Sequence, residues 1–80
     1  MYNENPRKTL NSRPTFMKFR GETVDCIMTV ESNAHNGLIE MIAEANKDFK
    51  TIDCQYGHAY DEHNREHVYS ALLLLQKTQT

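Results

Sequence analysis

Tryptophan is absent from this chain of 80 residues, and glycine, proline and cysteine are scarce, with three, two and two copies. The glycines, Gly21, Gly37 and Gly57, are scattered, so the chain has no glycine-rich loop of the kind that cradles phosphate groups. The cysteines, Cys26 and Cys54, are too far apart for a C-x-x-C redox motif. They predict reduced thiols in the core rather than a disulfide framework.

Long apolar runs are also missing. The longest run, Ala71 to Leu75, is far too short to cross a bilayer, and the first residues lack the apolar stretch of a secretory signal. We therefore expect no membrane partner and a cytoplasmic location.

Catalytic signatures are equally lacking. No nucleophile lies beside a base in a recognised catalytic order, and a domain of this length leaves little room for an enclosed substrate pocket. The sequence predicts no catalytic residues and a protein that is not an enzyme.

Charge is unevenly distributed along the chain. Residues 1–20 contain five Lys and Arg against one Glu, a net charge of +4, whereas residues 21–80 contain four Lys and Arg against ten Asp and Glu, a net charge of −6. An acidic body repels phosphate backbones, which argues against nucleic-acid binding by the body. The basic segment is the exception, and its candidate nucleic-acid contacts are Arg7, Lys8 and Arg13.

Residues 1–14 are polar and contain both prolines of the chain. This composition predicts a basic, flexible or extended arm. Residues 15–80 are expected to form a single domain.

Three segments have the composition or the alternation of β-strands: residues 15–20, 23–31 and 50–57. Arg20 and Gly21 between the first two predict a tight hairpin. The side chains expected on the inner face of the sheet are Val24, Cys26, Met28, Val30, Ile52, Cys54 and Tyr56.

Two further segments predict helices. Residues 38–49 place apolar side chains at helical spacing over roughly three turns, with Ser32 or Asn36 as candidate caps. A second helix is expected from Asp61, whose carboxylate can cap free amides, to about Lys77.

The predicted fold class is α+β. A small three-stranded sheet, built in the order strand, strand, helix, strand, helix, would carry both helices on one face and an extended N-terminal arm. A right-handed crossover through the first helix would place the last strand parallel to the strand at 23–31.

The apolar residues of the predicted C-terminal helix exceed what one sheet can cover. Val68, Leu72 and Leu75 share one face of that helix, whereas Tyr69 and Leu73 point away from it. A helix that is apolar all round needs cover on every side, and a second copy of the chain would supply it. The expected interface of this homo-oligomer consists of Val68, Tyr69, Leu72, Leu73, Leu74 and Leu75.

Three of the four histidines fall within ten residues. His63 and His67 are four apart, hence on one face of the predicted helix, and two imidazoles at this spacing can share a zinc ion. His58 or Asp61 would supply a third ligand from the loop, with Cys54 as a further candidate. The same residues are also typical of a solvated surface, so we expect no cofactor and keep zinc as the alternative.

Taken together, these features favour a small non-enzymatic protein-binding domain, regulatory or inhibitor-like, that self-associates through its C-terminal helix. A small zinc-binding protein and nucleic-acid contact through the basic arm are the two alternatives. These features predict a protein partner and do not identify it.

Overall fold

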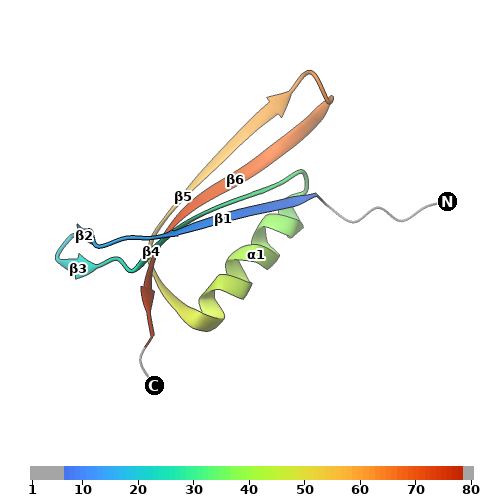
Figure 1. The fold of residues 1–80 in the computed structure, drawn as a ribbon. Coiled ribbons are helices and arrows are strands. Elements are labelled where there is room, and N and C mark those ends of the chain that lie inside the picture. The colour runs from blue at the N-terminus through green and yellow to red at the C-terminus, as the bar shows by residue number, and fades with distance from the viewer. Residues whose placement is uncertain (1–6, 79–80) are drawn as a thin grey trace.

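The structure, a computed structural model, describes residues 7–78. Within this range the chain forms a four-stranded antiparallel sheet, a small two-stranded sheet and one α-helix (Figure 1). In chain order the elements are β1 (Lys8–Pro14), β2 (Lys18–Phe19), β3 (Glu22–Thr23), β4 (Cys26–Ser32), α1 (His35–Asp48), β5 (Phe49–Asp61) and β6 (Glu66–Lys77).

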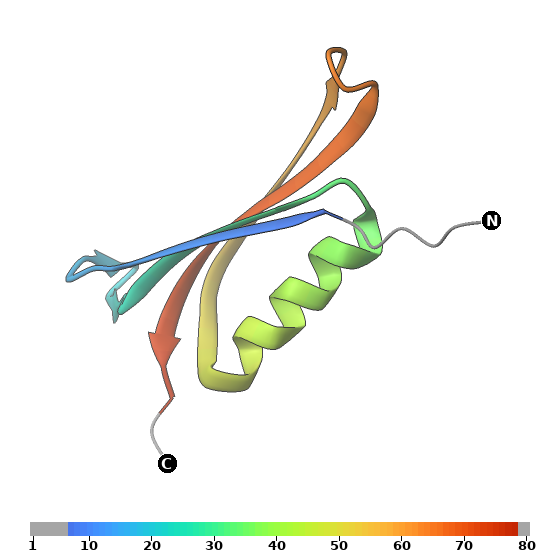
Figure 2. The same ribbon diagram turned by 45° about the vertical axis from the view of Figure 1, so that its right-hand side comes forward.

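The four-stranded sheet has the order β1-β4-β6-β5, so β1 and β5 form its two edges. Helix α1 packs across one face, against β4, β5 and β6. The pairing of β4 with β6 ends at Ser32 and Tyr69, whereas β5 and β6 remain paired as far as Asp61 and Glu66. The outer part of the β5–β6 hairpin therefore extends past the N-terminal end of the helix as a two-stranded ribbon (Figure 2).

The predicted fold class was wrong in three respects. The described residues hold one helix instead of two, the main sheet has four strands instead of three, and all of its pairs are antiparallel. The strand expected at 23–31 corresponds to β4, the strand expected at 50–57 lies within β5, and the helix expected at 38–49 corresponds to α1. The strand expected at 15–20 shrinks to β2, which is joined to β3 by a tight turn at Arg20 and Gly21.

The helix expected from Asp61 to Lys77 is instead β6 with the turn that precedes it. A continuous apolar run is compatible with a central strand that is covered on both faces, and periodicity alone does not separate it from a helix. Asp61 adds to the ambiguity because its carboxylate accepts the backbone N–H groups of His63 and Asn64, at 3.0 and 3.3 Å. A helix cap and an Asx turn use the same kind of hydrogen bond, and here it closes a hairpin.

The extended N-terminal arm was wrong for residues 8–14, which form edge strand β1 and pair with β4 along its whole length. All of its residues are exposed, so it has no apolar face from which alternation could have predicted a strand. The part of the predicted arm before Arg7 lies outside the described residues.

The core lies between α1 and the sheet. Its buried side chains are Met28, Val30, Leu38, Met41, Ala45, Ala71, Leu73 and Leu75. Cys26 and Cys54 pack at its margin as free thiols, on strands that β6 separates. Val24 is buried outside this cluster, and Tyr56, which was expected on the inner face, is 70% exposed.

A β-bulge at Ile52 sets which side chains of β5 face the helix. Thr51 pairs with Leu75 and Asp53 with Leu74, so Ile52 is the extra residue. The bulge shifts the alternation by one position, so that Phe49 packs on the core before it and Cys54 packs on the core after it.

Helix α1 begins at His35, with Ala34 as its N-cap and without a side-chain cap. The hydroxyl of Ser32, one of the two expected caps, accepts the N–H of Ala34 instead. No helix within residues 7–78 combines the length and the apolar character that a membrane crossing requires.

Candidate functional site

Imidazole and phenol rings gather on the helix-facing side of the β5–β6 hairpin, where the hairpin extends past the start of α1. Strand alternation turns every second side chain of β5 and β6 toward this side. Directly opposite pairs are His58 with Tyr69 and Tyr60 with His67. We call the six residues on this surface the ring cluster: His35, Tyr56, His58, Tyr60, His67 and Tyr69.

His58 and His67 form the closest polar contact of the ring cluster. Nε2 of His58 lies 2.9 Å from Nδ1 of His67. The ring centroids are 5.0 Å apart and the ring planes differ by 14°. Since the nitrogens are much closer than the centroids, the rings meet edge to edge, as an N–H···N hydrogen bond requires, and one ring does not lie over the other.

Tyr69 occupies the middle of the ring cluster. Its ring centroid lies 4.8 Å from that of His58, 5.5 Å from that of His35 and 6.3 Å from that of His67. Tyr60 meets His67 edge to face at 5.0 Å. Ring pairs across two strands contribute to hairpin stability, and here they hold the part of the ribbon that α1 does not cover.

A shallow hollow of about 330 Å³ opens where the ring cluster meets the helix. It is lined by His35, Leu38, Tyr56, Gly57, His58 and Tyr69. Tyr56 and Tyr60 are 70% and 52% exposed. Interaction with Cys54, chiefly through a side-chain hydrogen bond, raises the pKa of Tyr56 above its usual value. This surface offers aromatic faces and hydrogen-bonding groups together, the mixture that favours binding.

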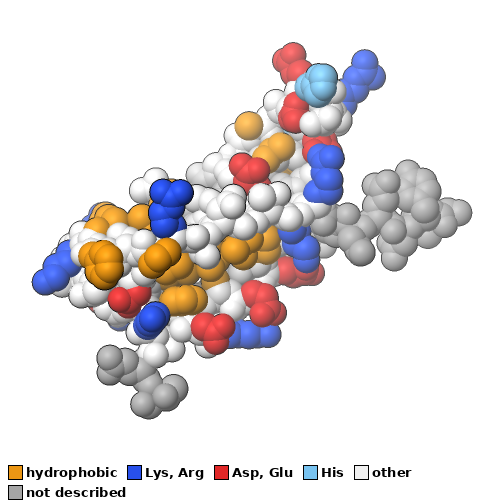
Figure 3. All heavy atoms as spheres, in the orientation of Figure 1, with side chains coloured by type: hydrophobic (Ala, Val, Ile, Leu, Met, Phe, Trp, Pro, Cys, Tyr) orange, Lys and Arg blue, Asp and Glu red, His pale blue; other side chains and the backbone are white. Residues whose placement is uncertain are grey.

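The hairpin tip is organised by Asp61. Besides the two backbone N–H groups, its carboxylate accepts the side-chain amide of Asn64 at 2.8 Å. Hydrogen bonds from the Asn64 side chain, and then from the backbone of Asn64, lower the pKa of Asp61. Arg65 closes the turn at a φ of 55°, in the left-handed region. Side chains of both charges crowd this tip (Figure 3).

The four predicted zinc ligands are only partly brought together. His58 and His67 meet, whereas His63 lies in the turn and Asp61 ends β5, where its carboxylate accepts the backbone N–H of His63 and does not contact its ring. The helical spacing that linked His63 to His67 is lost with the helix. In the part of the chain that the structure describes, no group of three His, Cys, Asp or Glu side chains is placed to hold a metal ion.

The predicted nucleic-acid contacts are largely engaged within the molecule. Arg7 forms an ion pair with Glu66, and Lys8 lies 3.4 Å from a carboxylate oxygen of Glu40. Arg13, at the other end of β1, lines an open depression on the sheet face away from the helix. Two of the three cations are thus partly neutralised, which weakens the electrostatic argument for phosphate binding.

The leucines of the predicted interface lie in strand β6, which places them on two faces of the sheet. Leu73 and Leu75 are fully buried, Leu74 is 6% exposed and Leu72 is 38% exposed. Because a strand turns its side chains to two faces, three of the four leucines are covered within one chain. The leucine run therefore gives no reason for self-association, which stays a prediction and needs another surface.

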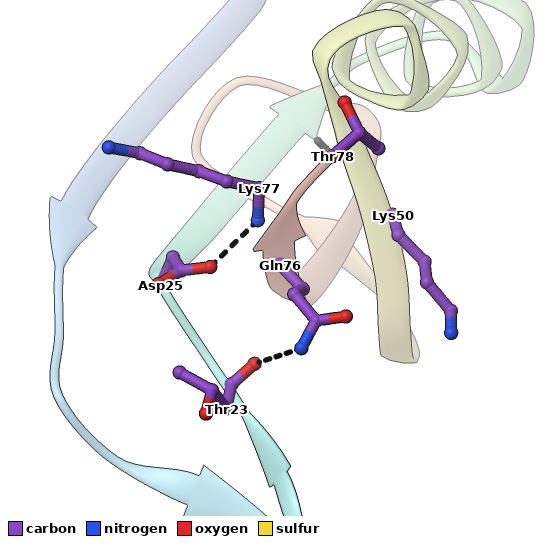
Figure 4. A pocket seen from close by; sticks show the side chains of 6 residues that line it. All are labelled: Thr23, Asp25, Lys50, Gln76, Lys77 and Thr78. Carbon is purple, nitrogen blue, oxygen red and sulfur yellow. Dashed lines mark hydrogen bonds between the residues drawn. The ribbon is translucent and has the colours of Figure 1, made fainter. Parts of the chain in front are cut away.

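A further depression, of about 680 Å³, lies at the opposite end of the sheet, near the end of β6 (Figure 4). Its polar groups are mostly paired with one another: Asp25 accepts the N–H of Lys77 at 2.8 Å, and the amide of Gln76 donates to the carbonyl of Thr23 at 3.1 Å. Lys50 lies 3.6 Å from Glu22. Because its groups pair with one another, this depression is a weaker candidate than the ring cluster.

Tyr56, Tyr60 and His35 were not predicted as site residues. The signal was the alternation of rings at 56, 58 and 60, and again at 67 and 69, which is typical of side chains on one face of a strand. The helix predicted from Asp61 had hidden it.

Comparison with protein-family models, with curated proteins and with solved structures gives no match for this chain.

Proposed function

We propose that this protein is a non-enzymatic binding protein that acts through the edge of β5. The partner that we propose for this edge is a second copy of the same chain. The observation that carries the proposal is a difference between the two edges of the main sheet.

Edge strand β1 is protected against pairing with other chains. It carries Lys8 and Arg13 and ends at Pro14, and charged side chains and proline are the usual means of blocking an edge. Edge strand β5 has a lysine and a bulge near its start, but its segment from Cys54 to Tyr60 contains neither proline nor a Lys, Arg, Asp or Glu side chain. This segment is the better template for an added strand.

The far end of this segment, at Ala59 and Tyr60, belongs to the two-stranded ribbon, whereas residues 54–58 pair with the part of β6 that also pairs with β4. A two-stranded hairpin is marginally stable by itself, whereas three or more strands gain stability from one another. The pairing of β4 with β6 ends at Tyr69, so the hairpin beyond that residue has two strands. A second copy paired along β5 would continue this ribbon into the sheet of the second copy.

Antiparallel pairing of two β5 strands about Gly57 fits the side chains as well as the backbone. Tyr56 of one copy would lie opposite His58 of the other, and Cys54 opposite Tyr60. These residues share the helix-facing side, so the two ring clusters would join into one band, and the contact would be self-complementary, as a two-fold dimer requires. One strand pair buries a small area, so we expect dissociation constants in the micromolar range.

Sedimentation velocity at increasing protein concentration tests this proposal. The informative variant is Gln55→Lys combined with Ala59→Lys, because the proposed pairing places residue 55 opposite residue 59 of the second copy and would bring like charges together. Within one chain these two positions are exposed and four residues apart on one strand. The matched control is Thr9→Lys with Asn11→Lys, two exposed positions on the other edge.

We expect the native chain and the β1 control to dimerise equally and the β5 variant to remain monomeric. A native chain that stays monomeric at high micromolar concentration would overturn the proposal. Equal loss of association in both lysine pairs would overturn the assignment to β5.

A further inference from the structure

His58 and His67 form a preformed pair of nitrogen donors. His58 comes from β5 and His67 from β6, at diagonal positions across the hairpin. Their facing nitrogens, Nε2 of His58 and Nδ1 of His67, are 2.9 Å apart. In a hydrogen bond, one of these nitrogens carries a proton; when neither does, two lone pairs occupy the same small space.

The separation of these nitrogens matches one kind of metal coordination better than another. With metal–nitrogen distances of about 2.0–2.1 Å, two ligands at 90° lie about 2.8–3.0 Å apart, and two ligands at the tetrahedral angle about 3.3–3.4 Å apart. Right-angled neighbours are the geometry of square-planar and tetragonal Cu²⁺ and Ni²⁺ sites. The observed 2.9 Å therefore favours these ions over tetrahedral Zn²⁺.

The surroundings hold both rings in place. Tyr69 packs against His58 and His67, and Tyr60 packs its ring against His67 from another direction. Rings that are already positioned lose less conformational entropy when they bind an ion than free surface histidines do. In the hydrogen bond the two nitrogens point at each other, so each ring must turn by about 45° to aim its lone pair at an ion that holds the two nitrogens at a right angle.

We propose that His58 and His67 chelate a divalent transition-metal ion with tetragonal preference, Cu²⁺ most tightly, through Nε2 and Nδ1 respectively. In residues 7–78 no third His, Cys, Asp or Glu side chain completes a group with them, so water occupies the remaining positions. This inference goes beyond the proposed self-association and does not depend on it, because both ligands come from one chain.

His63 provides an internal control. It lies in the same hairpin and was expected from the sequence to bind metal with His67, but it makes no ring contact with the cluster. A site that follows the helical spacing needs His63, whereas the site proposed here needs His58.

Calorimetric titration of Cu²⁺ into the untagged full chain tests the assignment, together with electron paramagnetic resonance to count the coordinating nitrogens. We expect one ion per chain with two imidazole nitrogens bound, and weaker binding of Ni²⁺ and then Zn²⁺. Loss of a group that merely orients a metal ligand already costs about 10–100-fold in affinity. His58→Phe and His67→Phe, which keep a ring in the cluster, should therefore each cost at least as much, whereas His63→Ala should have no effect.

Equal loss on removing His63 and His58, or unchanged binding in both phenylalanine variants, would overturn the site. Circular dichroism of each variant confirms that the sheet is intact. Titration of the Gln55→Lys, Ala59→Lys chain separates the two proposals: unchanged Cu²⁺ binding there supports a site within one chain, and its loss would overturn that claim.

Discussion

Leu73 and Leu74 are consecutive in the chain and lie on opposite faces of the sheet. Leu73 belongs to the core beneath α1 and is opposite Met28 of β4, whereas Leu74 is opposite Ile27 and lies outside that core cluster. This alternation is the central fact of the fold, because it gives one strand two apolar faces and covers three of the four leucines within one chain.

Alanine substitutions at Leu72 and Leu73 distinguish the strand from a helix. In the strand, Leu73 is fully buried, so Leu73→Ala should destabilise the protein by about 2–5 kcal/mol. Leu72 is 38% exposed, so Leu72→Ala should cost about 1 kcal/mol or less. Urea denaturation followed by circular dichroism measures both. A helix would place Leu72 inside and Leu73 outside, so the reverse order would contradict the strand.

The elements with clear alternation or amphipathicity were predictable. The polar–apolar alternation in β4 and the helical spacing in α1 reflect burial on one side, which leaves a periodic trace in the sequence. β6 was not predictable in this way, because its leucines occupy both faces of a central strand and leave no alternation between residues 72 and 75 to detect. β1 was not predictable either, because all of its residues are exposed and neither of its faces is apolar.

The candidate site was predictable in composition and not in geometry. The sequence singled out His58, His63 and His67, but the pairing of residues depends on the hairpin register, which brings His58 to His67 and leaves His63 in the turn. Register is a property of two strands together, set here by the bulge at Ile52 and the turn at Asp61, and no single segment encodes it.

The hairpin tip should respond to acid through Asp61. Its pKa is lowered, first by the side-chain amide of Asn64, so the folded tip favours the ionised carboxylate. The stabilisation from this group is present at pH values above the usual Asp pKa and is lost as the pH falls through the lowered value. Asn64→Ala removes the main donor and should move the pKa of Asp61 up toward its ordinary value, as measured by NMR titration of the carboxyl carbon.

His63→Ala is the matched control for that titration. His63 donates to Asp61 through its backbone N–H, which alanine retains, so the pKa of Asp61 should not change. If both substitutions shifted the titration equally, general loosening of the tip would explain the shift better than the Asn64 hydrogen bond.

Gly57 and Ser70 lie opposite each other on the sheet face away from the ring cluster, and their approach predicts a strong coupling between them. A Cβ atom added at Gly57 would lie 2.8 Å from Oγ of Ser70, and the backbone of Gly57 is not in the left-handed region. Gly57→Ala should therefore be destabilising with Ser70 present. In a chain that already carries Ser70→Ala, the Gly57→Ala substitution should instead stabilise the protein by about 0.4–1 kcal/mol, because alanine has fewer conformations than glycine in the unfolded chain. Urea denaturation is measured for the native protein, the two single variants and the double variant, at low concentration where any dimer dissociates. The four free energies of unfolding give the coupling energy between residues 57 and 70, which we expect to be about 0.5–2 kcal/mol. Additive effects would mean that the hydroxyl of Ser70 rotates away freely and that the close approach at the middle of β5 imposes no constraint.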